Sequence, residues 1–472
     1  MSETGVFSIR TPSRSMGLKL LLVCALALLM SVPALLVFAL LSDRTSRAEQ
    51  VAAEVGALTG GPQTFLGPVL AVPYITPPAA AGQPAERGVF VIFPTTGSAT
   101  ASIKSDVRRR GLFKVPVWAA DLTFRSSFDL GESVARAPSG AMLDWSRSEL
   151  LLGGSDARGA QQDIAVRAGT ADLTLSPAQT LSDVAMTAPE TRQRTPGQAS
   201  LRFFGAPAAG LAGPDAKFEV SAAARFTGAQ RLAVLAFGKT TAFSASGDSK
   251  GVGVEPSFDG GFLPTARQVN ADGFTATWRV PFIARGVPAE GTAETLSRLG
   301  ATALGVSLIE PANPYQAVSR SLKYAPMFIG IVFLTFSLFE ATRRTRVHPA
   351  QYVLIGLAQL VFYLLLLSIA ERTSFTTGFV IAATATVGLI STYAGWAFES
   401  RKQGFVALGI FGALYGLIYV LMRLEDFALL VGSVTCFAAL ALAMYFTRRI
   451  DWYGGGSPEP EEHAKPKPKT AK

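Results

Sequence analysis

The stretch KYAPMFIGIVFLTFSLFEATRRTRVHPAQYVLIGLAQLVFYLLLLSIAERTSF, residues 323–375, decides the organisation of this chain. Two apolar runs, residues 324–340 and 351–370, flank a basic connector that contains Arg343, Arg344 and Arg346. An apolar run of about 17–25 residues with few charges is typical of a membrane-spanning helix. Because short loops rich in arginine and lysine stay on the cytoplasmic side, the connector predicts the orientation of both runs.

The composition fits a membrane protein with a large water-facing part. The chain has 472 residues, of which 49% are hydrophobic and 16% are charged, and its net charge is +9. Such a charge suits nucleic acid or anionic lipid as a partner. Here the basic residues cluster beside apolar runs, which favours membrane orientation over nucleic-acid binding. Cys24 and Cys436 both lie in apolar runs, so the water-facing part has no disulfide framework.

The first apolar run, residues 18–41, follows a basic cytoplasmic tail of residues 1–17. The apolar part of a cleaved signal peptide is shorter, about 7–15 residues, and precedes a small-residue cleavage site. We therefore expect a signal anchor that stays in the protein as the first transmembrane helix. Residues 42–58 are helix formers that prolong it, and the Gly-Gly-Pro sequence at 60–62 ends it.

Residues 42–322 form the predicted water-facing domain. Between about residues 60 and 311 the chain has short runs that alternate apolar and polar side chains, which is typical of half-buried strands. Stretches rich in Gly and Pro separate these runs. The pattern predicts one large or two smaller β-rich parts with an ordinary packed core. The predicted strands include residues 89–93, 117–128, 163–167, 217–226 and 274–282.

The C-terminal part, residues 323–447, carries the remaining spans. Asn313 and Pro314 are suited to start a helix that reaches Tyr324, and Pro326 predicts a bend in it. The inner connectors are basic and the outer ones are near neutral, which places both termini in the cytoplasm. We thus predict an α+β membrane protein with a six-helix bundle and a periplasmic β-rich domain between spans 1 and 2. The later spans are residues 324–340, 351–370, 376–398, 404–422 and 427–446, followed by a disordered cytoplasmic tail of residues 448–472.

Histidine is scarce, with only His348 and His463, and both lie outside the predicted periplasmic domain. A Ser-His-Asp hydrolase and a His/Cys zinc site are therefore excluded in that domain. A Ser-Lys hydrolase and an all-carboxylate metal site remain open, although no residue spacing indicates either. The G-x-S-x-G at residues 247–251 is interpreted as a turn, and the Gly-Lys-Thr at 238–240 as a strand end and turn. The sequence predicts no catalytic, cofactor-binding or metal site.

The transmembrane runs contain no ionisable residue near mid-span, where functional charges of membrane proteins are found. Glu340, Glu371, Arg372 and Glu399 lie at span ends, where we expect them to reach water. A G-x-x-x-G at Gly412 and Gly416 predicts close helix packing. Polar residues gather in the third C-terminal span, and we favour a helix interface over a substrate path for them. These residues are Thr384, Thr386, Ser391, Thr392 and Tyr393.

Distinctive segments run through the whole chain, whereas about residues 136–216 carry none and are predicted to contain insertions. The segments are residues 67–73 (GPVLAVP), 256–267 (PSFDGGFLPTAR), Tyr324, 346–357 (RVHPAQYVLIGL), 362–375 (FYLLLLSIAERTSF) and 451–453 (DWY). Together they resemble the CreD family of bacterial inner-membrane proteins, also called cell envelope integrity proteins. The resemblance implies a Gram-negative inner-membrane protein that responds to a two-component system and is linked to envelope integrity, colicin tolerance and antibiotic stress. It implies no enzymatic activity and no catalytic residues.

We therefore expect a non-enzymatic protein that presents a periplasmic binding domain on a helical anchor. Its expected partners are the lipid bilayer and an envelope component or protein that binds residues 42–322, and the sequence indicates no oligomeric state. The alternative is a transporter or lipid-handling protein, which usually keeps charges or broken helices at the midplane. Residues 67–73 and 258–267 are interpreted as structural corners, with a partner surface as the alternative.

Overall fold

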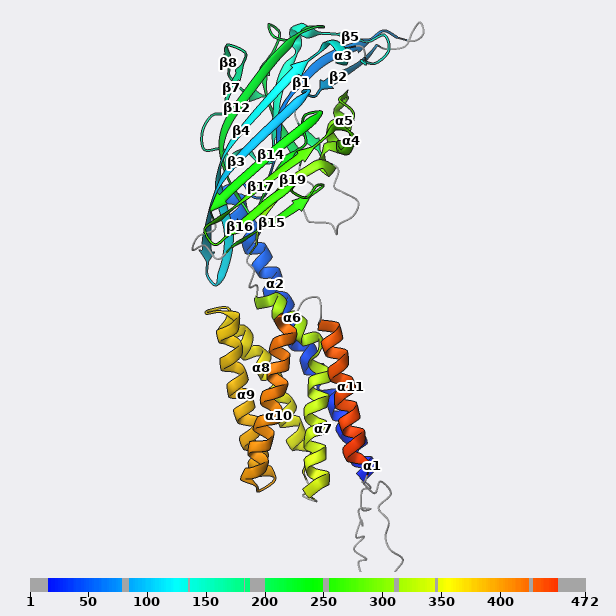
Figure 1. Ribbon diagram of the computed structural model, residues 1–472, viewed down its shortest axis with the longest axis vertical. Coiled ribbons are helices and arrows are strands. Elements are labelled where there is room, and N and C mark those ends of the chain that lie inside the picture. The colour runs from blue at the N-terminus through cyan, green and yellow to red at the C-terminus, as the bar shows by residue number, and fades with distance from the viewer. Residues whose placement is uncertain are drawn as a thin grey trace, which may run out of the picture. The chain divides into compact units, whose positions relative to one another are not determined.

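The computed structural model describes residues 16–78, 85–134, 136–181, 183–186, 200–248, 254–309, 314–343, 347–423 and 428–448. The chain divides into two compact units (Figure 1). The helical unit comprises Met1–Thr45 and Ala312–Lys472, and the sheet-rich unit comprises Ser46–Pro311. The mixture of helix and sheet confirms the α+β composition that the sequence predicts.

The long helices coincide with the predicted apolar runs to within a few residues. Pro33 has no N–H to donate to residue 29, which accounts for the short break at Met30 between the first two helices. The second helix continues to Thr59, as predicted, and Gly60 with a φ of 94° ends it. These helices are α1 (Met16–Leu29), α2 (Ser31–Thr59), α6 (Pro314–Lys323), α7 (Ala325–Arg343), α8 (Pro349–Ala370), α9 (Phe375–Ala397), α10 (Arg401–Arg423) and α11 (Ala428–Thr447).

Within the part of the chain that the structure describes, four helices are long and apolar enough to cross a membrane. They are the helix through residues 21–59, α8, α9 and α10. The bent pair of α6 and α7, with an angle of 54° between its halves, makes a fifth candidate. Pro326, near the start of α7, cannot donate a backbone hydrogen bond, which explains the predicted bend. The apolar part of α11, Leu430–Leu442, is shorter, so the six-span count remains a prediction.

Some predicted features lie outside the described residues, and the structure does not test them. They are the tail before residue 16, Asn313, Arg344 and Arg346 of the basic connector, the loop of residues 424–427, and the tail after residue 448.

Two sheets pack around one hydrophobic core in the sheet-rich unit. Buried and exposed side chains alternate along the long strands of the second sheet, as the sequence pattern predicts. Among the described residues the first sheet contains β10 (Asp183–Ala185), β11 (Ser200–Pro207), β6 (Glu149–Gly154), β1 (Gln63–Thr76), β13 (Arg231–Leu235), β19 (Ala303–Ile309) and β15 (Glu255–Gly260) in that order, with β2 (Glu86–Ile92), β5 (Met142–Leu143), β9 (Ser176–Pro177) and β18 (Glu290–Gly291) at its margins. The second contains β16 (Ala266–Asn270), β17 (Gly273–Val280), β14 (Thr240–Asp248), β3 (Thr96–Arg110), β4 (Phe113–Asp129), β12 (Lys217–Ala229), β7 (Ala165–Ala168) and β8 (Ala171–Leu173). The short helices are α3 (Gly131–Val134), α4 (Phe282–Arg285) and α5 (Ala293–Arg298).

Phe237 lies where the chain passes from β13 to β14, and thus from the first sheet to the second. Its side chain is fully buried. A Cβ added at Gly67 of β1 would lie 2.7 Å from this ring, and one added at Gly97 of β3 would lie 2.6 Å from it. The ring also packs edge-on against Phe124 of β4, with 6.0 Å between centroids. Phe237 therefore fills the space between the two sheets.

β1 is the central strand of the first sheet and is almost wholly buried. It pairs in parallel with β13 and antiparallel with β2 and β6. The register with β6 shifts between Leu66 and Val69, because Pro68 cannot donate to the ladder. Both interpretations of residues 67–73 are therefore wrong, since this segment is neither a corner nor an exposed surface but the interior of a buried strand.

The second segment rich in Gly and Pro, residues 258–267, carries the chain from β15 in the first sheet to β16 in the second. Gly260 has a φ of 113°, which favours glycine, and a Cβ there would lie 2.0 Å from the Ala303 carbonyl oxygen. Arg231 Nε donates to Asp259 Oδ1 at 2.8 Å and fixes the strand before the turn. The interpretation as a structural corner is confirmed for this segment.

Candidate functional site

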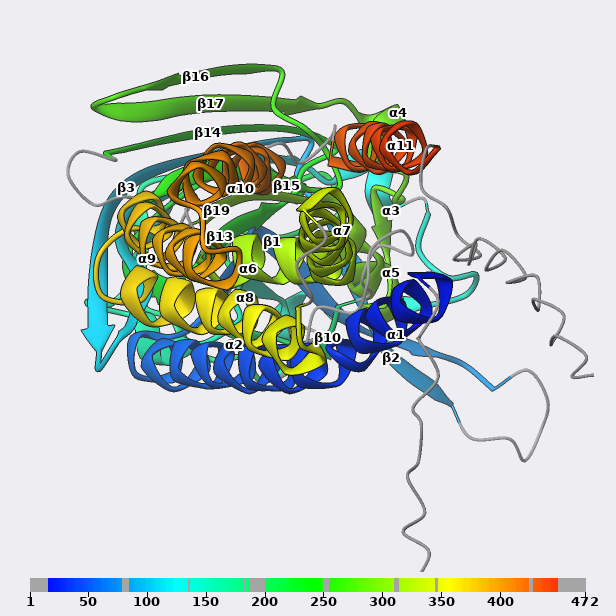
Figure 2. The ribbon, with the colours of Figure 1, turned by 90° about the horizontal axis from the view of Figure 1, so that it is seen from below.

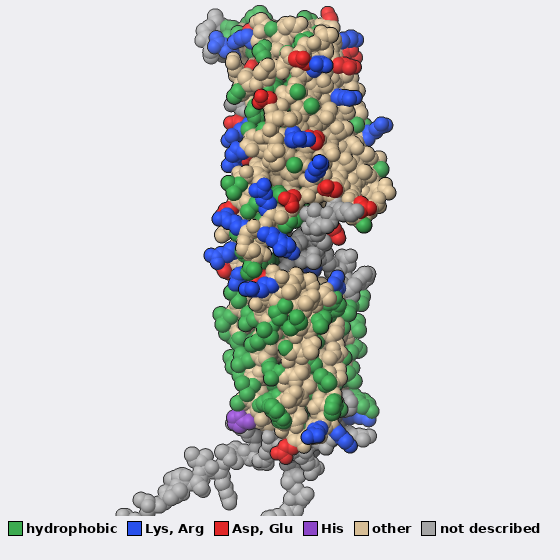
Figure 3. Space-filling model, turned by 90° about the vertical axis from the view of Figure 1, so that its left-hand side faces the viewer, with side chains coloured by type: hydrophobic (Ala, Val, Ile, Leu, Met, Phe, Trp, Pro, Cys, Tyr) green, Lys and Arg blue, Asp and Glu red, His purple; other side chains and the backbone are tan. Residues whose placement is uncertain are grey.

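The helical unit is packed around α8, α9 and α10, and Figure 2 shows α9 between the other two. α1 packs against α7 and α8 in the same unit. Hydrophobic side chains cover much of the outer surface of these helices (Figure 3). Such an apolar exterior fits the hydrocarbon of a bilayer better than water. Exposed examples are Leu354, Val361, Val380, Ile381, Leu389, Phe405, Val406, Val420 and Phe437.

His348 begins α8 with a capping box. Its Nδ1 accepts a hydrogen bond from the Ala350 N–H at 3.2 Å, and its own N–H donates to Gln351 Oε1 at 3.2 Å. Pro349 occupies the first turn, where its missing N–H costs nothing. The His-Pro-Ala-Gln sequence is therefore explained by helix initiation.

Glu340 ties the end of α7 to the start of α8. Its carboxylate accepts hydrogen bonds from the Val347 N–H at 3.0 Å and from the Tyr352 hydroxyl at 3.1 Å. The side chain is buried, so the expectation that Glu340 reaches water is wrong. Its hydrogen bonds explain how a carboxylate is accommodated there.

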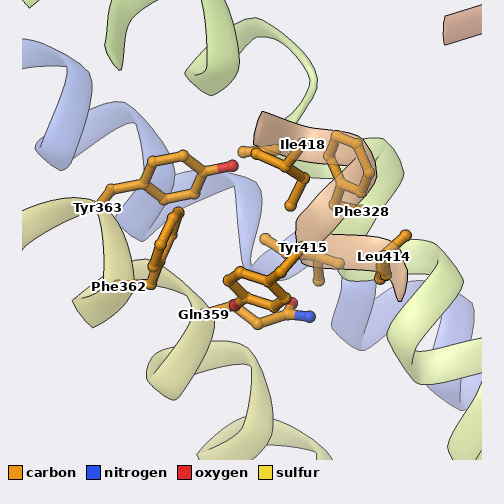
Figure 4. A pocket seen from close by; sticks show the side chains of 9 residues that line it. Phe328, Gln359, Phe362, Tyr363, Leu414, Tyr415 and Ile418 are labelled. Atoms are coloured by element: carbon orange, nitrogen blue, oxygen red, sulfur yellow. The ribbon is translucent and has the colours of Figure 1, made fainter. Parts of the chain in front are cut away.

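A small, mostly apolar cavity lies between α7, α8 and α10 (Figure 4). Its volume is about 10 Å³, close to the space that one water molecule requires. Gln359 is buried beside it, and its Oε1 has no hydrogen-bond partner among the described residues. The cavity therefore fits a single water but no organic substrate. Its lining consists of Ala325, Phe328, Ile329, Gln359, Phe362, Tyr363, Leu414, Tyr415 and Ile418.

The polar residues of α9 do not gather into one path. Thr386 and Ser391 are buried, whereas Thr384 and Thr392 are exposed. Thr392 donates to the Gly388 carbonyl of its own helix at 2.8 Å. Ser391 lies where α9 meets α10, since a Cβ added at Gly404 of α10 would lie 3.3 Å from its carbonyl oxygen. This distribution supports helix packing over a substrate path.

Three sequence motifs have no site around them. A Cβ added at Gly412 or Gly416 would meet no atom within 4 Å, so the predicted close helix contact is wrong for the described part of the chain. Gly238 and Lys239 form a bend between β13 and β14, and Thr240 begins β14, which agrees with the interpretation as a strand end and turn. In the G-x-S-x-G motif, Gly247 and Asp248 end β14, and residues 249–251 lie outside the described residues.

The sheet-rich unit buries the charged side chain of Arg285 at the end of α4. In this short helix the apolar residue is exposed and the charged residue is buried, because Ile283 is 93% exposed while Arg285 is only 2% exposed. The Arg285 guanidinium lies over the Phe93 ring, 4.2 Å from its centroid. Its Nη1 donates to the Pro288 carbonyl at 3.3 Å, and its Nε and Nη2 have no hydrogen-bond partner among the described residues.

Glu290, in β18, is the buried acidic residue of the same cluster. Its Oε1 accepts from Arg136 Nη1 at 2.9 Å, and its Oε2 has no partner within the described chain. Burial lowers the pKa of Arg285 to about 10, and the charge of Glu290 acts in the opposite direction. Arg285 therefore stays positive at neutral pH, and Glu290 compensates its charge.

Among the described residues of the sheet-rich unit, Arg285 and Glu290 are the buried charged side chains, and sequence reasoning missed them. Nothing in the Phe-Ile-Ala-Arg sequence of α4 indicates that the arginine is the buried residue. Gln359 was also missed, although an amide in the middle of an apolar span is a visible signal. Among the described residues no group of three or more His, Cys, Asp or Glu side chains could hold a metal ion.

The apolar helices and the two-sheet unit together define a membrane protein of mixed helix and sheet. A family model described as inner membrane protein CreD matches residues 15–453. The inner membrane protein CreD of Escherichia coli (strain K12) is 27% identical over 447 residues, which cover 92% of each chain. The chain belongs to the CreD family, as the resemblance of its segments predicts.

Proposed function

We propose that this protein is a non-enzymatic inner-membrane protein that supports cell envelope integrity under envelope and antibiotic stress. Its sheet-rich unit acts as the binding domain, and its helices act as an anchor. The observation that carries this proposal comes from the described residues of the helical unit, where the cavity between α7, α8 and α10 has a volume of about 10 Å³ and accommodates one water. More than half of the chain belongs instead to the sheet-rich unit, which is where a ligand or partner would bind.

The proposed topology has six spans, with both termini in the cytoplasm and residues 42–322 in the periplasm. The basic segments beside the spans support this orientation, with Arg401 and Lys402 after the fourth span and Arg448 and Arg449 after the last.

A reporter that is active only in the cytoplasm tests this topology. Fused after Ile450 it is expected to be active, and inserted near Lys250 it is expected to be inactive. The reason is that short basic connectors stay on the cytoplasmic side of the membrane. A periplasm-only reporter at the same positions is the control and must show the opposite pattern. Cytoplasmic activity near Lys250, or its absence after Ile450, would overturn the topology.

A chimera tests whether the sheet-rich unit carries the function and the helices serve only as an anchor. The sheet-rich unit is kept, and all transmembrane segments are replaced by one unrelated anchor. If the helices act only as an anchor, the chimera restores resistance to envelope-active agents in a deletion strain. Fractionation and protease accessibility verify that the chimera is folded and reaches the membrane.

A transporter or lipid-handling protein is the second candidate function, and the unpartnered Oε1 of Gln359 beside a cavity is the observation that favours it. Under this alternative the folded chimera fails. Conservative changes at Thr384, Thr386, Ser391 and Gln359 in the full chain then also abolish resistance. That combination would refute the anchor proposal.

A further inference from the structure

The tip of the β3–β4 hairpin has the sequence Arg-Arg-Arg-Gly-Leu-Phe-Lys, residues 108–114. The two strands stay paired up to Arg110 and Phe113, and Gly111 makes the turn with a φ of 63°. Arg108 and Arg109 are exposed, and Leu112 at the apex is 41% exposed. An exposed apolar residue flanked by cations is the composition of segments that lie in a membrane interface.

The hairpin is held on the part of α2 that belongs to the sheet-rich unit. Arg110 forms an ion pair with Glu54 of α2. Val115 and Val117, just beyond the tip, pack with Val55 of α2 in a small hydrophobic cluster. The tip is therefore fixed to this helix by both charge and packing.

The same helix, α2, also contains the end of the first predicted transmembrane run, so it connects the hairpin to that run. The apolar run of residues 18–41 ends about 13 residues before Glu54. At about 1.5 Å per helical residue this separation corresponds to roughly 20 Å along α2. Chain connectivity thus keeps a membrane surface within reach of the tip.

Positively charged side chains outnumber negatively charged ones near the tip. Glu54 is engaged with Arg110, and the Asp106 carboxylate accepts from the Val107 N–H at 2.8 Å. Arg108 and Arg109 remain exposed beyond these acidic residues. Figure 3 shows Lys and Arg side chains gathered at one end of the sheet-rich unit. This excess of positive charge fits a surface of phosphate groups.

We propose that residues 108–114 dock on the membrane that the protein's own helices span. Arg108 and Arg109 bind the phosphate groups of anionic phospholipids, and Leu112 enters the interfacial layer. The contact would hold the sheet-rich unit at the bilayer surface. This inference goes beyond the proposed function and does not depend on a role in envelope integrity.

The test uses the full chain with Cys24→Ser, Cys436→Ser and Leu112→Cys, labelled at the new cysteine with an environment-sensitive fluorophore. The protein is reconstituted in nanodiscs of phosphatidylcholine, with or without phosphatidylglycerol, that contain a spin-labelled lipid as quencher. Quenching of the tip is expected to be several-fold stronger in the anionic nanodiscs and to fall as salt is added. Removing both arginines, with Arg108→Gln and Arg109→Gln, is expected to weaken docking about thirtyfold and to abolish the difference.

The matched control is Arg267→Gln with Arg279→Gln, which removes two exposed charges from β16 and β17 of the same sheet. Arg279 pairs in register with Ala242, which lies opposite Ser98 near the start of β3 and thus far from the tip. This control is expected to retain the quenching. Equal quenching in neutral and anionic nanodiscs, or an equal loss in the control, would overturn the proposal. An acidic protein partner for the tip predicts no quenching in pure lipid, which would likewise refute membrane docking.

Discussion

Replacement of Phe237 by alanine is expected to lower the free energy of unfolding of the sheet-rich unit by about 4 kcal/mol. The ring is fully buried between β1 and β3, and Gly67 and Gly97 leave room for it because neither has a Cβ. Backbones on either side approach the ring closely, so the two sheets cannot collapse into the space that alanine would leave. The cavity cost therefore adds to the lost hydrophobic burial.

Denaturant titration of the full chain in detergent measures this loss. Trp396 and Trp452 are replaced by phenylalanine, so that the tryptophans of the sheet-rich unit report its unfolding. Phe282→Ala is the matched control, because the same atoms are removed from a side chain that is 44% exposed in α4. If both variants lose the same small amount, Phe237 does not join the sheets as described.

Replacement of Glu290 by glutamine is expected to destabilise the same unit by roughly 3 kcal/mol, because it leaves the buried Arg285 cation without a compensating charge. Arg285 stays charged at neutral pH, since burial lowers its pKa only to about 10. Arg136, which forms the ion pair with Glu290, is half-exposed and can return to water. The cost therefore arises at Arg285.

Two further variants isolate this effect in the same denaturant assay. Asp121→Asn breaks the exposed ion pair with Arg225 and is expected to change stability little. The double variant Arg285→Met with Glu290→Gln removes both buried charges and is expected to recover most of the loss. An unchanged stability of Glu290→Gln, or a double variant that is worse than the single one, would contradict charge compensation.

The sequence predicts the parts of this fold that depend on local periodicity. The apolar run of residues 351–370 becomes α8 and that of 376–398 becomes α9 within two residues, because a helix in lipid satisfies its own backbone. The alternating run of residues 217–226 lies in β12 for the same local reason. Residues 67–73 were misinterpreted because Gly67 and Pro68 usually mark turns. Their tolerance inside β1 depends on Phe237, about 170 residues later in the chain.

The candidate site was less predictable than the fold. Arg285 and Glu290 are close in sequence and interact electrostatically, but the burial of both depends on β2 and Phe93, which are distant in the chain. Glu340 shows the same limit, because its partner Val347 comes from a connector whose path no periodicity indicates. The absence of histidine from residues 42–322 excludes a Ser-His-Asp site there from the sequence alone, since this argument depends on composition and not on packing.

The position of β1 at the centre of its sheet also governs when the sheet-rich unit can fold. β1 pairs with β13, and β13 pairs with β19, so the sheet stays open until Ile309 has been synthesised. Pairings that close loops of more than 100 residues form slowly, because chain entropy is lost before contacts are gained. Pro314 begins the next helix almost at once. During synthesis the ribosome therefore begins the next candidate membrane helix while the strands made earlier still have unpaired edges. We expect chaperones and proteases to act on the chain at this stage.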